Sequence, residues 1–135
     1  MKEYPYSELS ALDPLRDRIT LEQACGDAFV QRREPPAPEE KAAAAAALGR
    51  ARTAMLSGEY DVVVIDEACV SIHFGLIATG DVVALLDARP DRVELVLTGR
   101  YCPETLVERA DLVTEMREVR HYYTRGIASR RGIEW

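Results

Sequence analysis

The segment "GEYDVVVIDEACVSIHFGL", residues 58–76, decides the fold class of this chain. Its uninterrupted apolar run over 62–65 is typical of a buried strand, and the glycine that precedes it favours a turn. Asp66 and Glu67 follow at the point where such a strand has to reach the surface. The segment therefore predicts a buried strand over 61–65 with two carboxylates at its carboxyl end.

A long helix is expected before this strand. Pro38 suits its first turn, and Glu39 and Glu40 favour the positive end of the helix dipole. Six alanines over 42–47 have the highest helix propensity of any residue type, and Gly58 is a natural stop.

The other segments alternate between strand and helix patterns. We expect a short strand over 18–23, a loop over 26–40, a helix over 79–90, a strand over 92–100, a helix over 102–110 and one or two short strands over 111–123. Such an alternation is typical of a parallel sheet with crossover helices. The predicted fold class is therefore α/β. A chain of 135 residues without a repeat or a second composition type predicts a single domain over 1–135.

Composition limits the classes of function. Hydrophobic residues make up 47% of the chain and charged residues 30%, as in an ordinary soluble globular protein. The formal net charge of -6 disfavours broad binding to nucleic acid, which needs a basic surface. No apolar stretch approaches the roughly 20 residues that span a bilayer, and the N-terminus has no signal-peptide core. Three cysteines without close pairs predict free thiols, so we expect a cytoplasmic protein with no membrane partner.

Polar residues gather at three predicted strand ends. They are Asp66 and Glu67; Thr98, Gly99 and Arg100; and Thr114, Glu115, Met116 and Arg117. In parallel α/β sheets the carboxyl ends of the strands face the ligand crevice. Acids at such an end are therefore placed to meet a ligand rather than the core.

Four apolar residues followed by Asp66 and Glu67 match the Walker B pattern of nucleotide-binding folds, in which an acid holds Mg²⁺ directly or through water. An equally ordinary alternative is a strand that ends in acids for solubility or as a helix cap. The usual companion of Walker B, the phosphate loop G-x-x-x-x-G-K-[ST], is absent from the sequence. "GLIATGDV" (75–82) has the glycine spacing, but Asp81 occupies the lysine position and would repel phosphate.

The C-terminal stretch offers cations in place of that lysine. Arginines this close together either clamp phosphate or carboxylate oxygens or form a solvated surface segment. His73 and His121 lie far apart without acid or cysteine partners at ligand spacing, so they do not indicate a metal site. The arginines concerned are Arg117, Arg120, Arg125, Arg130 and Arg131.

Three longer blocks carry a resemblance to a known family. They are "VVVIDEACVSIHFGL" (62–76), "VELVLTGRYCPETLVERADLVTEMREVRH" (93–121) and "GIASRRGIEW" (126–135). Over essentially all 135 residues the chain resembles the ATP:corrinoid adenosyltransferases of the CobA/BtuR/CobO type. The resemblance implies a RecA-like P-loop α/β fold, often homodimeric, that transfers the 5′-deoxyadenosyl group of ATP to cobalt. It also implies Mg²⁺, a corrinoid substrate such as cob(I)alamin or cob(I)yrinic acid a,c-diamide, and an electron donor that reduces cobalt to Co(I).

The resemblance implies roles for individual residues. Glu67 matches the family's metal-binding acid and Asp66 supports it, which makes these two the implied catalytic and Mg²⁺-binding residues. Phe29 matches an aromatic position in the loop that covers the lower face of the corrinoid. The other residues implied to bind ATP or corrinoid are Thr98, Gly99, Arg100, Glu115 and Arg117.

The chain departs from the family pattern in three places. Many members have Phe-Thr-Trp where this chain has "FVQ" (29–31), and asparagine where it has Cys69. The family's first strand, Walker A loop and first helix have no counterpart, so we expect an N-terminally truncated form of the fold. Two other functions therefore stay open: a non-catalytic corrinoid-binding or partner protein of this family, and an unrelated nucleotide-binding fragment.

Overall fold

The computed structural model describes residues 11–24, 35–130 and 133, which fall into two compact units. One unit spans Ala24–Asp111 and contains both strands found in these ranges. The other draws its described residues from the segments that end at Gln23 and begin at Leu112.

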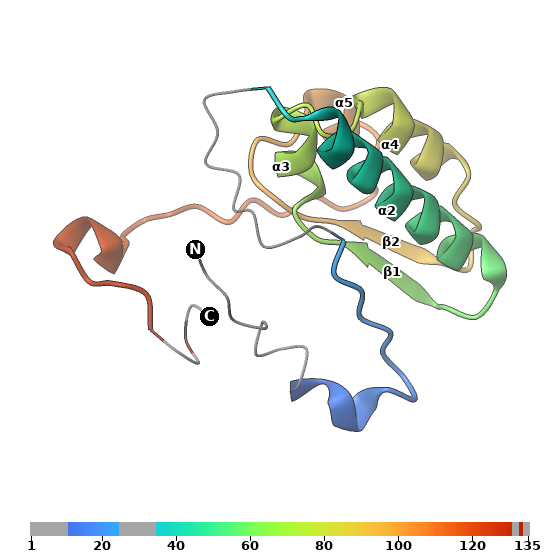
Figure 1. Ribbon diagram of the computed structural model, residues 1–135, viewed down its shortest axis with the longest axis horizontal. Helices are drawn as coiled ribbons and strands as arrows, with labels where there is room; N and C mark the ends of the chain where they lie inside the picture. Colours follow the sequence, from blue (N-terminus) through green and yellow to red (C-terminus); the bar gives the residue numbers. More distant parts are fainter. Residues whose placement is uncertain (1–10, 25–34, 131–132, 134–135) are drawn as a thin grey trace. The chain divides into compact units, whose positions relative to one another are not determined.

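The larger unit alternates helices and strands. Its elements are, in chain order, α2 (Pro38–Ser57), β1 (Val62–Ile65), α3 (Ala68–His73), α4 (Thr79–Asp87), β2 (Glu94–Leu97) and α5 (Glu104–Val107). The two strands pair in parallel, with Val62 opposite Glu94 and Ile65 opposite Leu97. Figure 1 shows α2 and α4 side by side over the strands, with α3 and α5 toward the end where the strands finish. The unit is therefore α/β with a small parallel sheet, as the sequence predicts.

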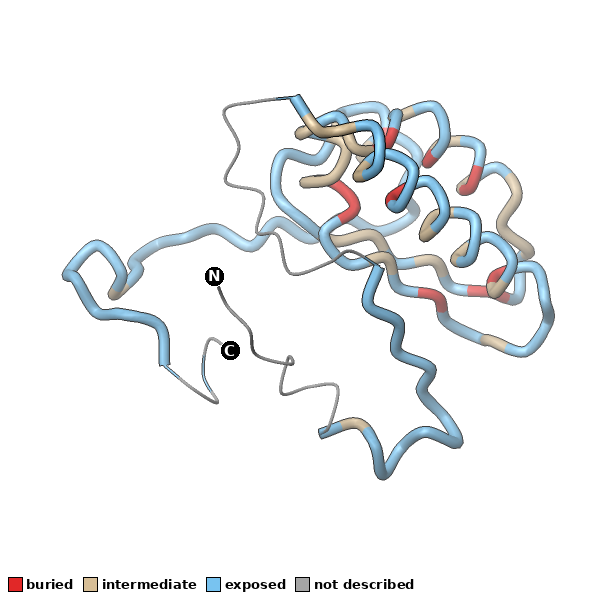
Figure 2. The backbone as a smooth tube through the Cα atoms, viewed as in Figure 1, coloured by how far each residue is buried: buried red, intermediate tan, exposed pale blue. Residues whose placement is uncertain are grey.

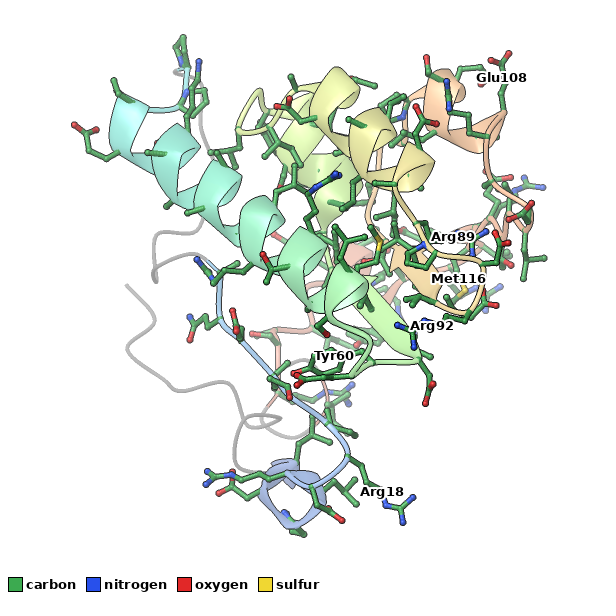
Figure 3. The ribbon with its side chains drawn as sticks, turned by 90° about the vertical axis from the view of Figure 1, so that its right-hand side faces the viewer. Arg18, Tyr60, Arg89, Arg92, Glu108 and Met116 are labelled. Atoms are coloured by element: carbon green, nitrogen blue, oxygen red, sulfur yellow. The ribbon has the colours of Figure 1, made fainter. Side chains whose placement is uncertain are left out.

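The long helix α2 begins and ends where its sequence predicts. At its start, the Glu40 carboxylate accepts a hydrogen bond from the Ala37 backbone N–H at 2.7 Å, which satisfies one of the free donors of a helix N-terminus. At its end, Gly58 has a left-handed φ of 85°, and an added Cβ would lie 2.6 Å from Nη2 of Arg92. The left-handed φ is what favours glycine there, because the end of the flexible Arg92 side chain could move aside. Figure 3 labels the Arg92 side chain near this end of the helix. None of the helices in the described ranges is both long and apolar enough to cross a bilayer.

The core lies between the helices and one face of the sheet. Val63 of β1 and Val93, which precedes β2, pack with Met55 of α2 and Leu85 of α4. Figure 2 shows the buried positions concentrated where α2, α4 and the strands meet. A second buried cluster consists of Ala44, Ile77, Val82 and Leu106.

Within the larger unit, the described residues leave the opposite face of the sheet open. Side chains alternate between the two faces of a strand, so the neighbours of the buried Val63 point away from the helices. Val62 and Val64 are 51% and 58% exposed, and Val96 of β2 is 41% exposed. The larger unit thus has an uncovered valine face, made of Val62, Val64 and Val96.

The predicted strand over 18–23 is wrong. This segment follows the short 3-10 helix η1 (Asp13–Leu15) and runs as a turn and irregular chain. The backbone N–H groups of Arg18 and Ile19 both bond to the carbonyl of Leu15, at 2.8 Å each. These are bonds of a helical turn, which compete with the ladder that a strand needs.

The predicted strands over 111–123 are also wrong. Residues 112–121 have no regular structure, and Tyr122–Arg125 form the 3-10 helix η2. Leu112, Met116 and Val119 are 85%, 91% and 92% exposed. An apolar pattern becomes a strand only beside a pairing neighbour, and the sheet of the described chain contains β1 and β2 alone.

The remaining predicted elements are confirmed in shortened form. The helix over 79–90 ends at Asp87, the strand over 92–100 is confined to Glu94–Leu97, and the helix over 102–110 to Glu104–Val107. The sequence patterns did not predict α3. Its six residues are too few to display a helical apolar period.

The neighbouring residues Met55 and Leu56 of α2 give a direct test of this core. Met55 is fully buried, whereas Leu56 is 47% exposed. We expect Met55→Ala to lower the free energy of unfolding by about 2–5 kcal/mol, because it leaves a cavity against Leu85, and Leu56→Ala to cost clearly less. Urea denaturation of both variants measures the difference. Equal losses would contradict the placement of α2 on the sheet.

Candidate functional site

The carboxyl ends of β1 and β2 meet at the side chain of Thr98. Because Ile65 lies opposite Leu97 in the parallel register, the residues that follow them leave the sheet side by side. The Thr98 hydroxyl donates a hydrogen bond to Oδ1 of Asp66 at 2.5 Å. The hydroxyl oxygen of Thr98 accepts a hydrogen bond from the backbone N–H of Glu67 at 3.0 Å. One threonine therefore holds both acidic residues at the rim of the sheet.

Glu67 turns the chain from strand into helix. Its backbone is left-handed, with φ 56° and ψ 24°, and it precedes the first residue of α3. A side chain with a Cβ pays roughly 1–2 kcal/mol for that conformation, and the hydrogen bond from its N–H to Thr98 helps to offset the cost. The side chains of Asp66 and Glu67 are exposed, so both carboxylates are accessible to a ligand.

Gly99 lets the loop after β2 approach α3 closely. Its φ is 122°, and an added Cβ would lie 3.2 Å from the backbone nitrogens of Cys69 and Val70. The backbone N–H of Cys69 donates to the carbonyl of Thr98 at 3.1 Å. The loop and the first turn of α3 are therefore in direct backbone contact.

Two further residues of the loop form an aromatic and cationic surface. Tyr101 has a left-handed φ of 63°, and its ring stacks on that of His73 at 4.2 Å between centroids. The guanidinium carbon of Arg100 lies 5.8 Å from the centroid of the Tyr101 ring. Sequence patterns did not point to Tyr101, because the stacking joins two distant segments and depends on a backbone conformation that tyrosine seldom adopts.

Beside the acidic pair, Cys69 has a shifted pKa. Burial raises the pKa of this thiol to about 11, and the neighbouring Cys102 thiol and the charge of Glu67 add to the rise. Cys69 is buried and Cys102 is exposed, and both are free. The Cys69 thiol is therefore protonated at neutral pH.

The acidic pair fits one kind of metal site. Among the described residues, no group of three or more His, Cys, Asp or Glu side chains is arranged to hold a metal ion. The candidate site itself contains two exposed carboxylates on adjacent residues, Asp66 and Glu67. Mg²⁺ is commonly bound by one or two carboxylates together with waters and substrate phosphates, so the donors present suit Mg²⁺ that arrives with a nucleotide.

Comparison with known proteins identifies the family. The sequence model of the family described as "ATP:corrinoid adenosyltransferase BtuR/CobO/CobP" matches residues 1–135. The chain belongs to this adenosyltransferase family.

Curated relatives that are named corrinoid adenosyltransferase agree with this assignment. The corrinoid adenosyltransferase CobA of Salmonella typhimurium is 32% identical over 75 residues, which are 56% of this chain and 38% of that protein. The corrinoid adenosyltransferase of Pseudomonas aeruginosa is 37% identical over 84 residues, or 61% of this chain and 41% of that protein. An uncharacterised protein of Nostoc is 39% identical over 71 residues, or 53% and 19% of the two chains. The matched segments span less than half the length of these relatives.

The structure gathers part of the residue set that the family resemblance implies. Asp66, Thr98 and the backbone of Glu67 are in contact, and Gly99 and Arg100 continue the same loop. The implied residues Glu115 and Arg117 belong to the other unit, where both are exposed in irregular chain. Phe29 lies outside the described residues.

The role of Thr98 can be tested by substitution. Thr98→Val preserves the shape of the side chain but removes its hydroxyl, whereas Thr98→Ser keeps the hydroxyl. We expect the backbone amide of Glu67 to exchange with solvent about fivefold faster in the valine variant, because a hydrogen bond worth about 1 kcal/mol is lost. Amide exchange followed by NMR measures this rate. Identical rates in the two variants would rule out the bond.

Gly99 and Gly80 provide a second matched pair. Gly99→Ala introduces a Cβ at a left-handed φ and 3.2 Å from the backbone of α3, so we expect a loss of about 1–3 kcal/mol in stability. Gly80 in α4 has open space around it and no left-handed φ. Gly80→Ala should be neutral or mildly stabilising. Thermal unfolding followed by circular dichroism compares the two, and an unaffected Gly99→Ala variant would contradict the close loop contact.

Proposed function

We propose that this chain carries out the reaction of its family, the transfer of the 5′-deoxyadenosyl group of ATP to Co(I) of a corrinoid. The observation that carries the proposal is the cluster of Asp66, Glu67 and Thr98 at the carboxyl ends of two parallel strands. That edge is where parallel α/β sheets bind their ligands. The family match over 1–135 and the relatives named corrinoid adenosyltransferase support the choice of reaction.

Asp66 and Glu67 would hold the Mg²⁺ that accompanies ATP. When bound, this ion neutralises charge on the phosphate groups. Thr98 orients Asp66 through its hydrogen bond, so that the carboxylate keeps one direction at the rim. Arg100, which follows in the same loop, supplies a guanidinium suited to phosphate oxygens.

The proposed reaction is a nucleophilic substitution at the ribose of ATP. The electron pair of Co(I) forms a bond to the 5′ carbon, the bond between that carbon and its oxygen breaks, and triphosphate leaves with the electron pair. Phe29 would pack on the lower face of the corrinoid, and Glu115 and Arg117 would complete the binding of the two substrates. An external electron donor is needed to reduce cobalt to Co(I) before this step.

The same assignment extends to the fold and the assembly. We infer one adenosyltransferase-like domain of the RecA-like P-loop type over 1–135, supported by the family match across that range. A homodimer in the cytoplasm is our proposal for its working state. The exposed Val62, Val64 and Val96 support the need for a partner surface.

A second candidate is a corrinoid-binding protein of this family without ATP turnover. The observation that favours it is the absence of any G-x-x-x-x-G-K-[ST] segment in residues 1–135, since that segment is the usual cradle for phosphates. Both candidates place the corrinoid on this chain, and they differ in whether a cobalt–carbon bond forms.

An anaerobic adenosylation assay distinguishes the candidates. The chain is supplied with Mg·ATP and chemically reduced cob(I)alamin, and formation of the light-sensitive cobalt–carbon product is followed by absorbance. We expect repeated turnovers that fall by at least about 10-fold in Glu67→Gln, because the proposed metal ligand is lost and even outer-shell partners of a metal are worth about 10- to 100-fold. Glu59→Gln changes an exposed acid before β1 instead of after it and should leave the rate unchanged.

Each result has a clear meaning. Product formation that depends on Glu67 supports adenosyl transfer. Bound corrinoid without product supports the corrinoid-binding alternative. A chain that neither binds nor modifies the corrinoid overturns both.

A further inference from the structure

Two cysteines that lie far apart in the sequence come together beside the candidate site. Cys69 is in the first turn of α3 and is 2% exposed, whereas Cys102 is exposed in the loop between β2 and α5. The loop is fastened to α3 at its start, where the backbone N–H of Cys69 donates to the carbonyl of Thr98 at 3.1 Å.

The loop is fastened to α3 a second time, one turn further along the helix. The ring of Tyr101 stacks on His73, which lies four residues after Cys69 and therefore on the same side of the helix. Cys102 is the residue directly after Tyr101. The two attachments hold Cys102 against this side of α3, and its thiol is near enough to Cys69 to contribute to the raised pKa of that thiol.

The backbone of the loop fixes this approach. Gly99 and Tyr101 both have left-handed φ values, of 122° and 63°. At Gly99 the chain comes so near that an added Cβ would lie 3.3 Å from the Cβ of Cys69. The loop therefore has little freedom to carry Cys102 away from α3 without losing these contacts.

We propose that Cys69 and Cys102 form a reversible redox modification site, which closes to an intramolecular disulfide in the presence of a low-molecular-weight disulfide. The inference goes beyond the proposed function and holds whether or not the chain transfers adenosyl groups. Nothing in it requires ATP, a metal or a corrinoid.

The reaction proceeds by two thiol–disulfide exchanges. The exposed Cys102 sulfur attacks the small disulfide first, forms a mixed disulfide and releases one small thiol. The Cys69 thiol then gives up its proton to water, its sulfur attacks the Cys102 sulfur, and the second small molecule leaves as a thiolate that takes up a proton. The protein pair loses two protons and two electrons in total, and the small disulfide gains them as it becomes two thiols.

Closure links the two segments that build the candidate site. Cys69 follows Glu67 by two residues, and Cys102 follows Thr98 by four. The disulfide would therefore restrain the first turn of α3 against the loop that carries Gly99 and Arg100. Oxidation and reduction would switch the site between a cross-linked and an open form.

The experiment uses the full chain with Cys25→Ser, which removes the one other thiol in the sequence. The protein is incubated with oxidised glutathione, then unfolded, alkylated and examined by intact mass and peptide mapping. We expect a mass lower by two hydrogens, no alkylated thiol, and a peptide pair joined through Cys69 and Cys102. We also expect disulfide closure in the folded chain to be at least about tenfold faster than in urea, because the fold holds the sulfurs together.

Two variants in the same background identify the order of the steps. Cys69→Ser should stop the reaction at a glutathione adduct on Cys102. Cys102→Ser should leave Cys69 unmodified, because the Cys69 thiol is buried. We expect the Cys102→Ser variant to fold normally, because position 102 is exposed.

Three results would overturn the proposal. The first is a lasting glutathione adduct on Cys102 in a chain that still contains Cys69. The second is a disulfide between two chains in place of the internal one. The third is closure that is no faster in the folded chain than in urea.

Discussion

The hydroxyl of Thr98 holds two segments of the candidate site in place at once. It donates a hydrogen bond to the carboxylate of Asp66 and accepts one from the backbone N–H of Glu67, so the same hydroxyl acts as donor and as acceptor. The parallel register of β1 and β2 is what brings this hydroxyl to the end of the neighbouring strand. The carbonyl of the same residue anchors the first turn of α3 through Cys69. Thr98 therefore makes hydrogen bonds to Asp66 and Glu67 at the end of β1 and to Cys69 in the first turn of α3.

The elements decided by local chemistry were predictable from the sequence. The alanine run and the acidic first turn define α2, and the apolar run 62–65 defines β1. The strand predictions for 18–23 and 111–123 were wrong because a strand needs a pairing neighbour, and the described chain supplies none for these segments. A pattern along the chain states which side chains prefer burial, and it does not state whether a neighbour is present to bury them.

The candidate site also has a part that was predictable from the sequence and a part that was not. The rule that ligands meet the carboxyl ends of parallel strands selected Asp66, Glu67 and Thr98, and the structure places these residues in contact. The same rule also selected 114–117, which was wrong because no strand precedes these residues in the described chain. The neighbourhood of Cys69, Tyr101 and Cys102 was not predictable. It depends on left-handed backbone at Gly99, which glycine signals, and at Tyr101, which tyrosine does not signal.

Family membership and local geometry are independent kinds of evidence for the proposed function. The family match covers 1–135 but does not define how individual side chains meet. The hydrogen bonds of Thr98 define a local arrangement but no reaction. The proposed adenosyl transfer needs both, because a fold or a site taken alone is compatible with many functions.

The uncovered valine face connects the folding equilibrium of this chain with its surroundings. Val62, Val64 and Val96 are exposed in the larger unit, and a molecule that binds over them would remove them from water. A molecule that binds there in the folded chain and not in the unfolded chain stabilises the fold by mass action, by about 2.7 kcal/mol at 100 times its Kd. If that molecule is a second copy of the chain, the midpoint of unfolding rises with protein concentration. Dilution would then weaken the same fold that a concentrated solution keeps intact.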